Sequence, residues 1–293
     1  MYNGTETFGE IVKYRANQHQ NKRFVKFEEK ELTYKQFHEG GNKVANAFLN
    51  LGIKKGDKCA VMLPNCPEFL ITWVGLTRIG VVEVPVNIGL RGDLLIHILK
   101  QAECKAIVIS SEWVDRIVEI KDELKELQHV IIVGEVASPL EMGHLSTYDF
   151  DYFMESASNA EIDVPIKPTD DSLILFTSGT TGPSKGAILS HRANFALAKS
   201  CCDLMDYSPK DRLYTVFPLY HVNAKYATIL AALVAGSDVV MHNRFSASRF
   251  WDICRKEQVT TFNYMGSMIT ILMKQPEKPN DRDNPVRQIQ GAP

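Results

Sequence analysis

The sequence predicts an α/β fold in which mainly parallel sheets are covered by helices on both faces. Short β-rich runs alternate with helical segments almost throughout the 293 residues, and such alternation is typical of parallel strands joined by crossover helices. The segment 134–169 is the least regular and contains three prolines, so we interpret it as a connection between two α/β lobes. The predicted lobes are residues 1–165, including this connection, and residues 166–293.

The elements of the first lobe follow from the spacing of apolar residues. Pro67 stands in the first turn of a predicted helix, and leucines and isoleucines recur at helical spacing after Arg91. The predicted helices cover 67–79, 91–102 and a segment that continues through Glu126. The predicted strands cover 58–63, 106–110 and 130–133.

The second lobe begins with an apolar run at 172–176, which leads into a glycine-rich loop and then a short strand at 187–189. Further strands are predicted at 213–216 and 239–241, and helices at 192–204, 224–235, 247–257 and 265–274. A polar loop at 275–284 precedes a final β-like run. Because no helix or cap follows this run, we expect residues 1–293 to be an incomplete domain.

Composition excludes several functional classes. A net charge of −2 gives no basic surface for nucleic acid. The longest apolar stretch, 227–241, is interrupted by a Gly-Ser-Asp sequence and is too short to span a bilayer, and the N-terminus lacks the pattern of a signal peptide. Six cysteines occur without metal-binding spacing. We therefore expect a soluble, cytoplasmic protein with reduced cysteines, including core positions for Cys201 and Cys202.

The sharpest feature is the segment Thr177–Gly186, TSGTTGPSKG. Glycines permit backbone conformations that are closed to other residues, which lets successive N–H groups converge on one anion. Four hydroxyl side chains add donors, and Lys185 adds a mobile positive charge. The pattern predicts a triphosphate-binding loop formed by Thr177, Ser178, Gly179, Thr180, Thr181, Gly182 and Lys185.

This segment is not a Walker loop. The Walker pattern G-x-x-x-x-G-K-[ST] requires glycine directly before the lysine, where this chain has Ser184. The residues after the loop also have the pattern of a strand. We therefore expect a nest of backbone N–H groups to bind the anion in preference to the dipole of a following helix.

The segment TSGTTGPSKG, followed by Ser190 and His191, resembles the phosphate-binding signature of the adenylate-forming superfamily. This superfamily includes acyl-CoA ligases, peptide-synthetase adenylation domains and firefly-type luciferases. Other segments resemble further core motifs of the family along nearly the whole chain: Leu32–Tyr34, Gly75–Gly80 with Pro85–Asn87, Pro218–His221 and Gly291–Pro293. The chain departs from the usual pattern at Pro183–Ser184 and at Gln290, where many members have a second glycine.

The resemblance implies the layered αβαβα N-terminal domain of these enzymes, with two helix-covered, mainly parallel sheets, here truncated. It also implies a ligase reaction that uses ATP, Mg²⁺ and coenzyme A. A carboxylic acid attacks the α-phosphate of MgATP to give an acyl-adenylate and pyrophosphate, and a thiol, usually that of CoA, then displaces AMP. By this resemblance the loop holds the phosphates and Lys185 is a catalytic residue.

The remaining candidate residues follow from resemblance and position. His221 is implied as a second catalytic residue between the acyl pocket and the adenylate, and Gly291, Ala292 and Pro293 are implied to lie along adenine. The expected acyl pocket consists of His221, Asn223, Tyr226, Tyr264, Met265 and Gly266. The alternative for His221 is a hydrogen-bonded loop histidine, and the alternative for Tyr264, Met265 and Gly266 is plain core packing.

Other parts implied by the resemblance are absent from residues 1–293. These are the glutamate that helps to hold magnesium, the acidic residue for the ribose, the hinge, and the C-terminal lid with its lysine. No metal ligand is therefore predicted in this chain, and we expect it to be inactive alone. Two other readings remain open: an adenylating enzyme that uses a carrier protein as acceptor, and a truncated, non-catalytic nucleotide-binding module.

The acid itself is less well defined. Three segments resemble crotonobetaine/carnitine–CoA ligases and related fatty-acid–CoA ligases: Asn65–Phe69, Phe245–Trp251 and Leu272–Pro276. A quaternary ammonium acid calls for an aromatic cage or a carboxylate, for which Tyr220, Tyr226 and Tyr264 are candidates. Fatty acids of medium or long chain remain an alternative. An exposed apolar edge, buried by formation of a homodimer, is a further expectation.

Overall fold

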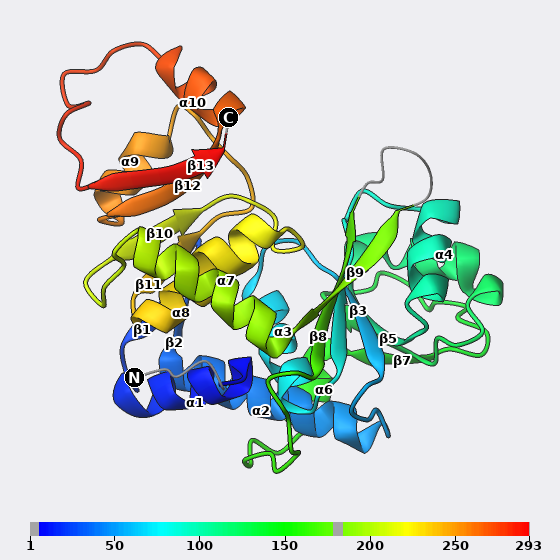
Figure 1. The fold of residues 1–293 in the computed structure, drawn as a ribbon. Helices are drawn as coiled ribbons and strands as arrows, with labels where there is room; N and C mark the ends of the chain where they lie inside the picture. The colour runs from blue at the N-terminus through cyan, green and yellow to red at the C-terminus, as the bar shows by residue number, and fades with distance from the viewer. Residues whose placement is uncertain (1–5, 178–183, 293) are drawn as a thin grey trace. The chain divides into compact units, whose positions relative to one another are not determined.

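The computed structural model describes residues 6–177 and 184–292. The chain divides into two compact units (Figure 1). The first unit comprises residues 1–13 and 36–193, and the second comprises residues 14–35 and 194–293. The boundaries between the units fall within three helices: α1 (Phe8–Gln18), α2 (Tyr34–Asn50) and α7 (His191–Leu204).

The first unit contains a seven-stranded sheet with the order β7-β6-β5-β3-β4-β8-β9. Neighbouring strands are parallel except for β8 and β9, which form an antiparallel pair. The strands are β3 (Lys58–Met62), β4 (Val82–Pro85), β5 (Cys104–Ser110), β6 (His129–Val133), β7 (Ser146–Asp149), β8 (Asp171–Thr177) and β9 (Lys185–Ser190).

Both faces of the central strands of this sheet are buried. On one face α4 (Gly92–Gln101) and α5 (Asp115–Ile120) pack onto the apolar core of the strands, with side chains such as Leu95 and Ile117 fully buried. The alternate strand residues, among them Val61 and Val108, are also fully buried. On that side α3 (Pro67–Arg78) contacts β4, and α6 (Phe150–Glu155) contacts β6 and β7.

The second unit contains a six-stranded sheet with the order β13-β12-β10-β11-β1-β2, antiparallel only between β1 and β2. Its strands are β1 (Arg23–Phe27), β2 (Lys30–Thr33), β10 (Arg212–Thr215), β11 (Asp238–Met241), β12 (Thr261–Met265) and β13 (Gln288–Ala292). The chain passes from β10 to β11 on one side and then to β12 on the other side of β10. The sheet therefore has a topological switch point between β10 and β12, the position where ligands bind in open α/β sheets.

Helices cover this sheet as well. The π-helix η3 (Asn223–Leu230) contacts β10 and β12, and α8 (Ala231–Ala235) contacts β11. The other face packs against α9 (Phe250–Lys256) and α10 (Gly266–Met273) through an aromatic cluster that includes Phe250 and Phe262. Figure 1 shows α9 and α10 beside β12 and β13.

Two ionic networks fix the ends of the strands in the second unit. Asp238 is almost fully buried and accepts hydrogen bonds from Arg23 and Arg212. Asp211 accepts bonds from Arg287, which directly precedes β13, at 2.8 Å. Burial by itself raises the pKa of the Asp211 carboxyl, but the bonds from Arg287 and Thr260 outweigh it and lower the pKa to about 2. The Arg287–Asp211 pair therefore ties the start of β13 to the sheet.

The structure confirms the predicted fold class of α/β with two helix-covered, mainly parallel sheets. The helix predicted to continue through Glu126 is wrong in extent, because α5 ends at Ile120 and a 3₁₀ turn (Lys121–Glu123) follows. The irregular segment 134–169 contains β7 and α6. The two units also differ from a single division near residue 165, since β8 and β9 complete the first sheet, whereas β1 and β2 belong to the second.

Within the described ranges 6–177 and 184–292, no helix has the length and apolar character needed to cross a bilayer.

Candidate functional site

The two arms of the glycine-rich segment are strands β8 and β9 of the first unit. They pair antiparallel from Asp171 opposite Ser190 to Thr177 opposite Lys185 (Figure 1). The expectation that a strand follows the loop is thus confirmed by β9. Thr177 and Lys185 are exposed at the end of the pair where residues 178–184 join the two strands. The candidate residues Ser178, Gly179, Thr180, Thr181 and Gly182 lie outside the described residues.

The hairpin has a rigid base because β8 is built into the sheet. Leu173 and Ile174 are buried, and Leu173 pairs with Glu83 in β4. Phe176 also packs against the apolar core of the unit. The position of Thr177 is therefore set by a strand with a neighbour on each side, whereas Lys185 begins an edge strand that pairs with β8 alone.

Three other candidate segments meet at the carboxyl edge of the second sheet. The turn Pro218–His221 follows β10, Gly266 follows β12, and Gly291 lies near the end of β13. Since β10, β12 and β13 are parallel neighbours, their carboxyl ends lie at one edge of the sheet, beside the switch point between β10 and β12. The structure thus brings together the acyl-pocket and adenine candidates that the sequence assigned separately.

His221 is the exposed last residue of the turn that leads into η3. Its backbone N–H donates to the carbonyl oxygen of Pro218 at 3.0 Å, and its ring lies 4.8 Å from the ring of Tyr220. Desolvation by the surrounding protein lowers the pKa of the imidazole. The ring is therefore held in its neutral form near pH 7, in which one nitrogen donates and the other accepts.

Asn263 joins β12 to the π-helix, a role that the sequence does not indicate. Its side-chain Nδ2 lies 3.0 Å from the Asn223 Oδ1 and 2.8 Å from the Thr228 Oγ1. The residue is buried, and the bonds fix the side chain of Asn223 at the first turn of η3. The sequence near either residue does not indicate this contact, because Asn263 and Asn223 are 40 residues apart.

The remaining candidates differ in exposure. Tyr226 is fully buried, Tyr264 is half-buried, and Met265 is 46% exposed. Tyr264 pairs with Gly291, and the pairing continues with Met265 opposite Ala292. A Cβ at Gly291 would collide with the carbonyl oxygen and ring of Tyr264, so the strand approaches β12 more closely than a larger residue allows. Pro293 lies outside the described residues.

The described part of the chain lacks a cluster of metal-binding side chains, and the thiol of Cys202 is held in its protonated form. Residues 6–177 and 184–292 contain no group of three or more His, Cys, Asp or Glu side chains that could hold a metal ion. Burial raises the pKa of the Cys202 thiol to about 11, so this thiol stays protonated near neutral pH.

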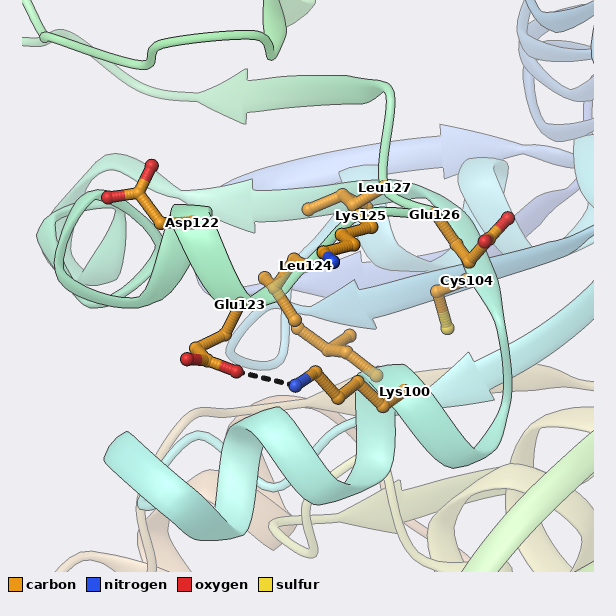
Figure 2. A pocket seen from close by; sticks show the side chains of 9 residues that line it. Lys100, Cys104, Asp122, Glu123, Leu124, Lys125, Glu126 and Leu127 are labelled. Atoms are coloured by element: carbon orange, nitrogen blue, oxygen red, sulfur yellow. Dashed lines mark hydrogen bonds and ion pairs between the residues drawn. The ribbon is translucent and has the colours of Figure 1, made fainter.

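A separate cavity of about 400 Å³ opens at the amino edge of the first sheet (Figure 2). Lys100 and Glu123 face each other at this cavity and form an ion pair of 2.6 Å. Burial raises the pKa of the Cys104 thiol in its lining to about 12, which leaves the thiol protonated. Cys104 begins β5, whereas Thr177 ends β8, so this cavity lies at the opposite edge from the glycine-rich segment.

The sequence of residues 12–293 matches the family described as AMP-binding enzyme. Crotonobetaine/carnitine–CoA ligases from Salmonella typhimurium and Salmonella heidelberg are each 35% identical to this chain over 263 residues. The aligned region covers 89% of this chain and 50% of each relative. The chain therefore spans about half the length of these curated relatives.

Solved structures agree on the fold. The N-terminal domain of FACL13 from Mycobacterium tuberculosis matches 98% of this chain with a TM-score of 0.83 and 23% identity, over 69% of its own length. The anthranilate CoA ligase AuaEII, in complex with anthranoyl-AMP, matches 99% of this chain with a TM-score of 0.86 and 19% identity, over 55% of its own length. With the family match over residues 12–293, these findings show that the chain belongs to the AMP-binding enzymes, the adenylate-forming family of the acyl-CoA ligases.

Proposed function

We propose that residues 1–293 are the phosphate- and acyl-binding part of an ATP-dependent acid–CoA ligase. In the first half-reaction a carboxylate oxygen attacks the α-phosphorus of ATP, and pyrophosphate leaves. In the second, the sulfur of CoA attacks the acyl carbonyl carbon, and AMP leaves. The observation that carries the proposal is the β8–β9 hairpin, which places Lys185 opposite Thr177 at the ends of the TSGTTGPSKG segment.

In this proposal the loop and Lys185 lower the main free-energy barrier of the first half-reaction. Two anions must approach each other, so positive charge and oriented donors lower the barrier by stabilising the developing pyrophosphate. In this proposal Thr177, Ser178, Gly179, Thr180, Thr181 and Gly182 donate to the β- and γ-phosphates. The exposed ammonium group of Lys185 neutralises the leaving group.

The carboxyl edge of the second sheet supplies the acyl and adenine contacts in this proposal. Gly291, Ala292 and Pro293 lie along adenine, and the acyl group is bounded by His221, Asn223, Tyr226, Tyr264, Met265 and Gly266. The neutral imidazole of His221 can donate a hydrogen bond to the adenylate without adding charge. The bonds from Asn263 keep Asn223 in one orientation toward this edge.

Magnesium belongs to the proposed reaction. A Mg²⁺ ion takes carboxylate and phosphate oxygens as ligands, and the family resemblance implies a glutamate outside residues 1–293 that helps to hold it. We place its protein ligands outside residues 1–293. We likewise place the ribose-binding acid and the lid with its adenylation lysine there. In this proposal the two α/β lobes supply the phosphate, acyl and adenine contacts of the enzyme.

The substrate class is proposed from the curated relatives. Their names specify crotonobetaine and carnitine, and they are 35% identical to this chain. A small carboxylic acid of this kind is the first candidate, and medium- or long-chain fatty acids are the second.

The test is carboxylate-dependent ATP–pyrophosphate exchange with a panel of carnitine, crotonobetaine, short, medium, long and aromatic acids. The longer protein that contains residues 1–293 should exchange label with one acid class, and residues 1–293 alone should not sustain it. Sustained exchange by residues 1–293 alone would contradict the assignment of essential groups to other segments. Absence of exchange by the longer, folded protein with every acid would contradict the ligase assignment.

Self-association is a separate proposal that rests on exposed apolar side chains. Met265, Ile271 and Ile289 are each more than 40% exposed, and Met273 is 81% exposed. Exposed apolar side chains on β12, β13 and α10 favour burial against a second copy of the chain. Light scattering of residues 1–293 should give the mass of a dimer, and Met273→Lys should shift the equilibrium toward the monomer. A monomer at all concentrations of the unaltered chain would refute this proposal.

A further inference from the structure

Strand β9, which begins at Lys185, has a neighbouring strand on one side only. Because β9 is an edge strand, its first residues are held by bonds to β8 alone within the sheet. Ser184 directly precedes Lys185, the first residue of β9. A group that fixes the Ser184 backbone therefore also fixes the origin of the Lys185 side chain.

His97 in α4 makes this contact. Its Nε2 lies 2.9 Å from the carbonyl oxygen of Ser184. A carbonyl oxygen only accepts, so Nε2 must carry the proton and donate. The same ring lies edge-on to the ring of Phe176 in β8, with centroids 6.4 Å apart and an interplanar angle of 80°. His97 thus touches both arms of the hairpin, each one residue away from Thr177 or Lys185.

The helix that carries His97 is a firm support. Leu95, Ile98 and Leu99 of α4 are all at most 4% exposed and belong to the core cluster of the first unit. These flanking side chains leave α4 little freedom to shift relative to the sheet. His97 is itself only partly buried, so its role is not explained by packing of the core.

We propose that His97 is a positioning residue for Lys185, and that the Nε2–H bond to the Ser184 carbonyl sets the position of this lysine. This inference rests on the proposed function of Lys185 as the phosphate ligand. His97 does not touch the phosphates in this proposal and acts through the backbone.

A first experiment tests the structural half of the inference without nucleotide. Trypsin cleaves after Lys185 when local opening exposes the backbone there. The cleavage rate, followed by mass spectrometry, therefore measures how often the start of β9 separates from β8. Loss of one hydrogen bond in His97→Phe should raise the cleavage rate about fivefold. His97→Gln retains an N–H donor and should cleave at the rate of the unaltered chain.

A matched control is available in the same unit. His144 also contacts a backbone carbonyl through Nε2, that of Leu124 at 3.3 Å, but belongs to the segment before β7, away from the hairpin. His144→Phe should leave cleavage after Lys185 unchanged. An unchanged cleavage rate in His97→Phe would overturn the inference whatever the reaction of the protein, and so would an equal increase in His144→Phe.

A second experiment tests the functional half in the longer, active protein. His97→Phe should lower kcat/KM for ATP about fivefold while the KM for the carboxylic acid stays constant, and His97→Gln should restore the value. Combined with Lys185→Met, His97→Phe should add no further loss, because its effect passes through Lys185. Fully additive losses would overturn the inference. Absence of exchange in the unaltered protein would instead refute the proposed function, and the cleavage rates would still decide the position of His97.

Discussion

At the residue scale, the imidazole of His191 couples the stability of the first unit to pH. The residue is 2% exposed, and neither ring nitrogen has a hydrogen-bond partner among the described residues. Desolvation is the main cause that lowers its pKa from 6.5 to about 4, and the nearby Asp170 offsets this in part. Above pH 6.5 the ring is neutral in both the folded and the unfolded chain. Between pH 6.5 and 4 the unfolded chain binds a proton that the folded chain does not, so stability falls as the pH falls.

We predict that His191→Gln reduces this acid sensitivity. Between pH 7.5 and 5, His191 should cost the unaltered chain about 2 kcal/mol of unfolding free energy, given 1.36 kcal/mol per pKa unit. Urea denaturation at the two pH values measures the difference, and the variant should lose correspondingly less. His144→Gln serves as a control for removal of an imidazole elsewhere in the first unit. Equal pH dependence in His191→Gln and the unaltered chain would show that His191 is not buried in its neutral form.

Residue-scale chemistry was only partly accessible from the sequence. The loop motif predicts Lys185 near the end of a loop between two strands, because glycines, hydroxyls and a lysine follow one another, and the structure places Lys185 as the first residue of β9. The contacts of His97 with Ser184 and of Asn263 with Asn223 join residues 87 and 40 positions apart. Such pairings depend on strand order and register, which a single sequence does not specify.

At the element scale, helices α2 and α3 pack closely in the first unit where each has a glycine, Gly41 in α2 and Gly75 in α3. A Cβ at Gly75 would lie 3.0 Å from the carbonyl oxygen of Gly41 and would collide with the side chain of Val44. A Cβ at Gly41 would similarly meet Val74 at 2.5 Å. The valines are fully buried, so neither helix can yield without disturbing the core.

We therefore predict that Gly75→Ala destabilises the first unit by about 1–3 kcal/mol through overpacking, even though alanine has the higher helix propensity. Gly89→Ala is the matched control, since Gly89 is exposed and a Cβ there meets only Asn87 Oδ1 at 3.3 Å. Chemical denaturation with fluorescence of the buried Trp73 reports the change. A Gly75→Ala variant as stable as the control would contradict the close crossing.

Elements with regular apolar spacing were predictable, and irregular ones were not. The spacing after Pro67 and Arg91 predicted α3 and α4 to within one residue at each end. In contrast, β7 and α6 are short and lie among prolines, and their buried residues are too few to show a period. The π-helical hydrogen bonding of η3 replaced the first part of a predicted helix, because apolar spacing does not distinguish these two helical forms over two turns.

At the scale of the whole molecule, each unit assembles its sheet from distant parts of the chain. The second sheet pairs β1 with β11 although more than 200 residues separate them, so its formation requires the closure of a long loop. The strand–helix alternation predicts the α/β class. The sequence around β1 and β2 does not indicate that these N-terminal strands belong to the second sheet.

We propose that residues 1–293 supply only part of the site for the adenylation reaction. They span about half of their curated relatives, and in this proposal the β8–β9 hairpin binds phosphate and the carboxyl edge of the second sheet binds the acyl group. Magnesium, ribose and lid contacts are assigned to segments outside residues 1–293. In this proposal the chain supplies Lys185 to an adenylation reaction that it does not complete alone.

The most direct measurement is carboxylate-dependent ATP–pyrophosphate exchange by the longer protein, its Lys185→Met variant and residues 1–293 alone. The account predicts exchange by the longer protein with one class of acid, a loss of at least about 100-fold in the variant if Lys185 stabilises the leaving pyrophosphate, and no sustained exchange by residues 1–293. Equal exchange by the variant and the unaltered protein would contradict the role of the hairpin, and no exchange with any acid would contradict the ligase itself.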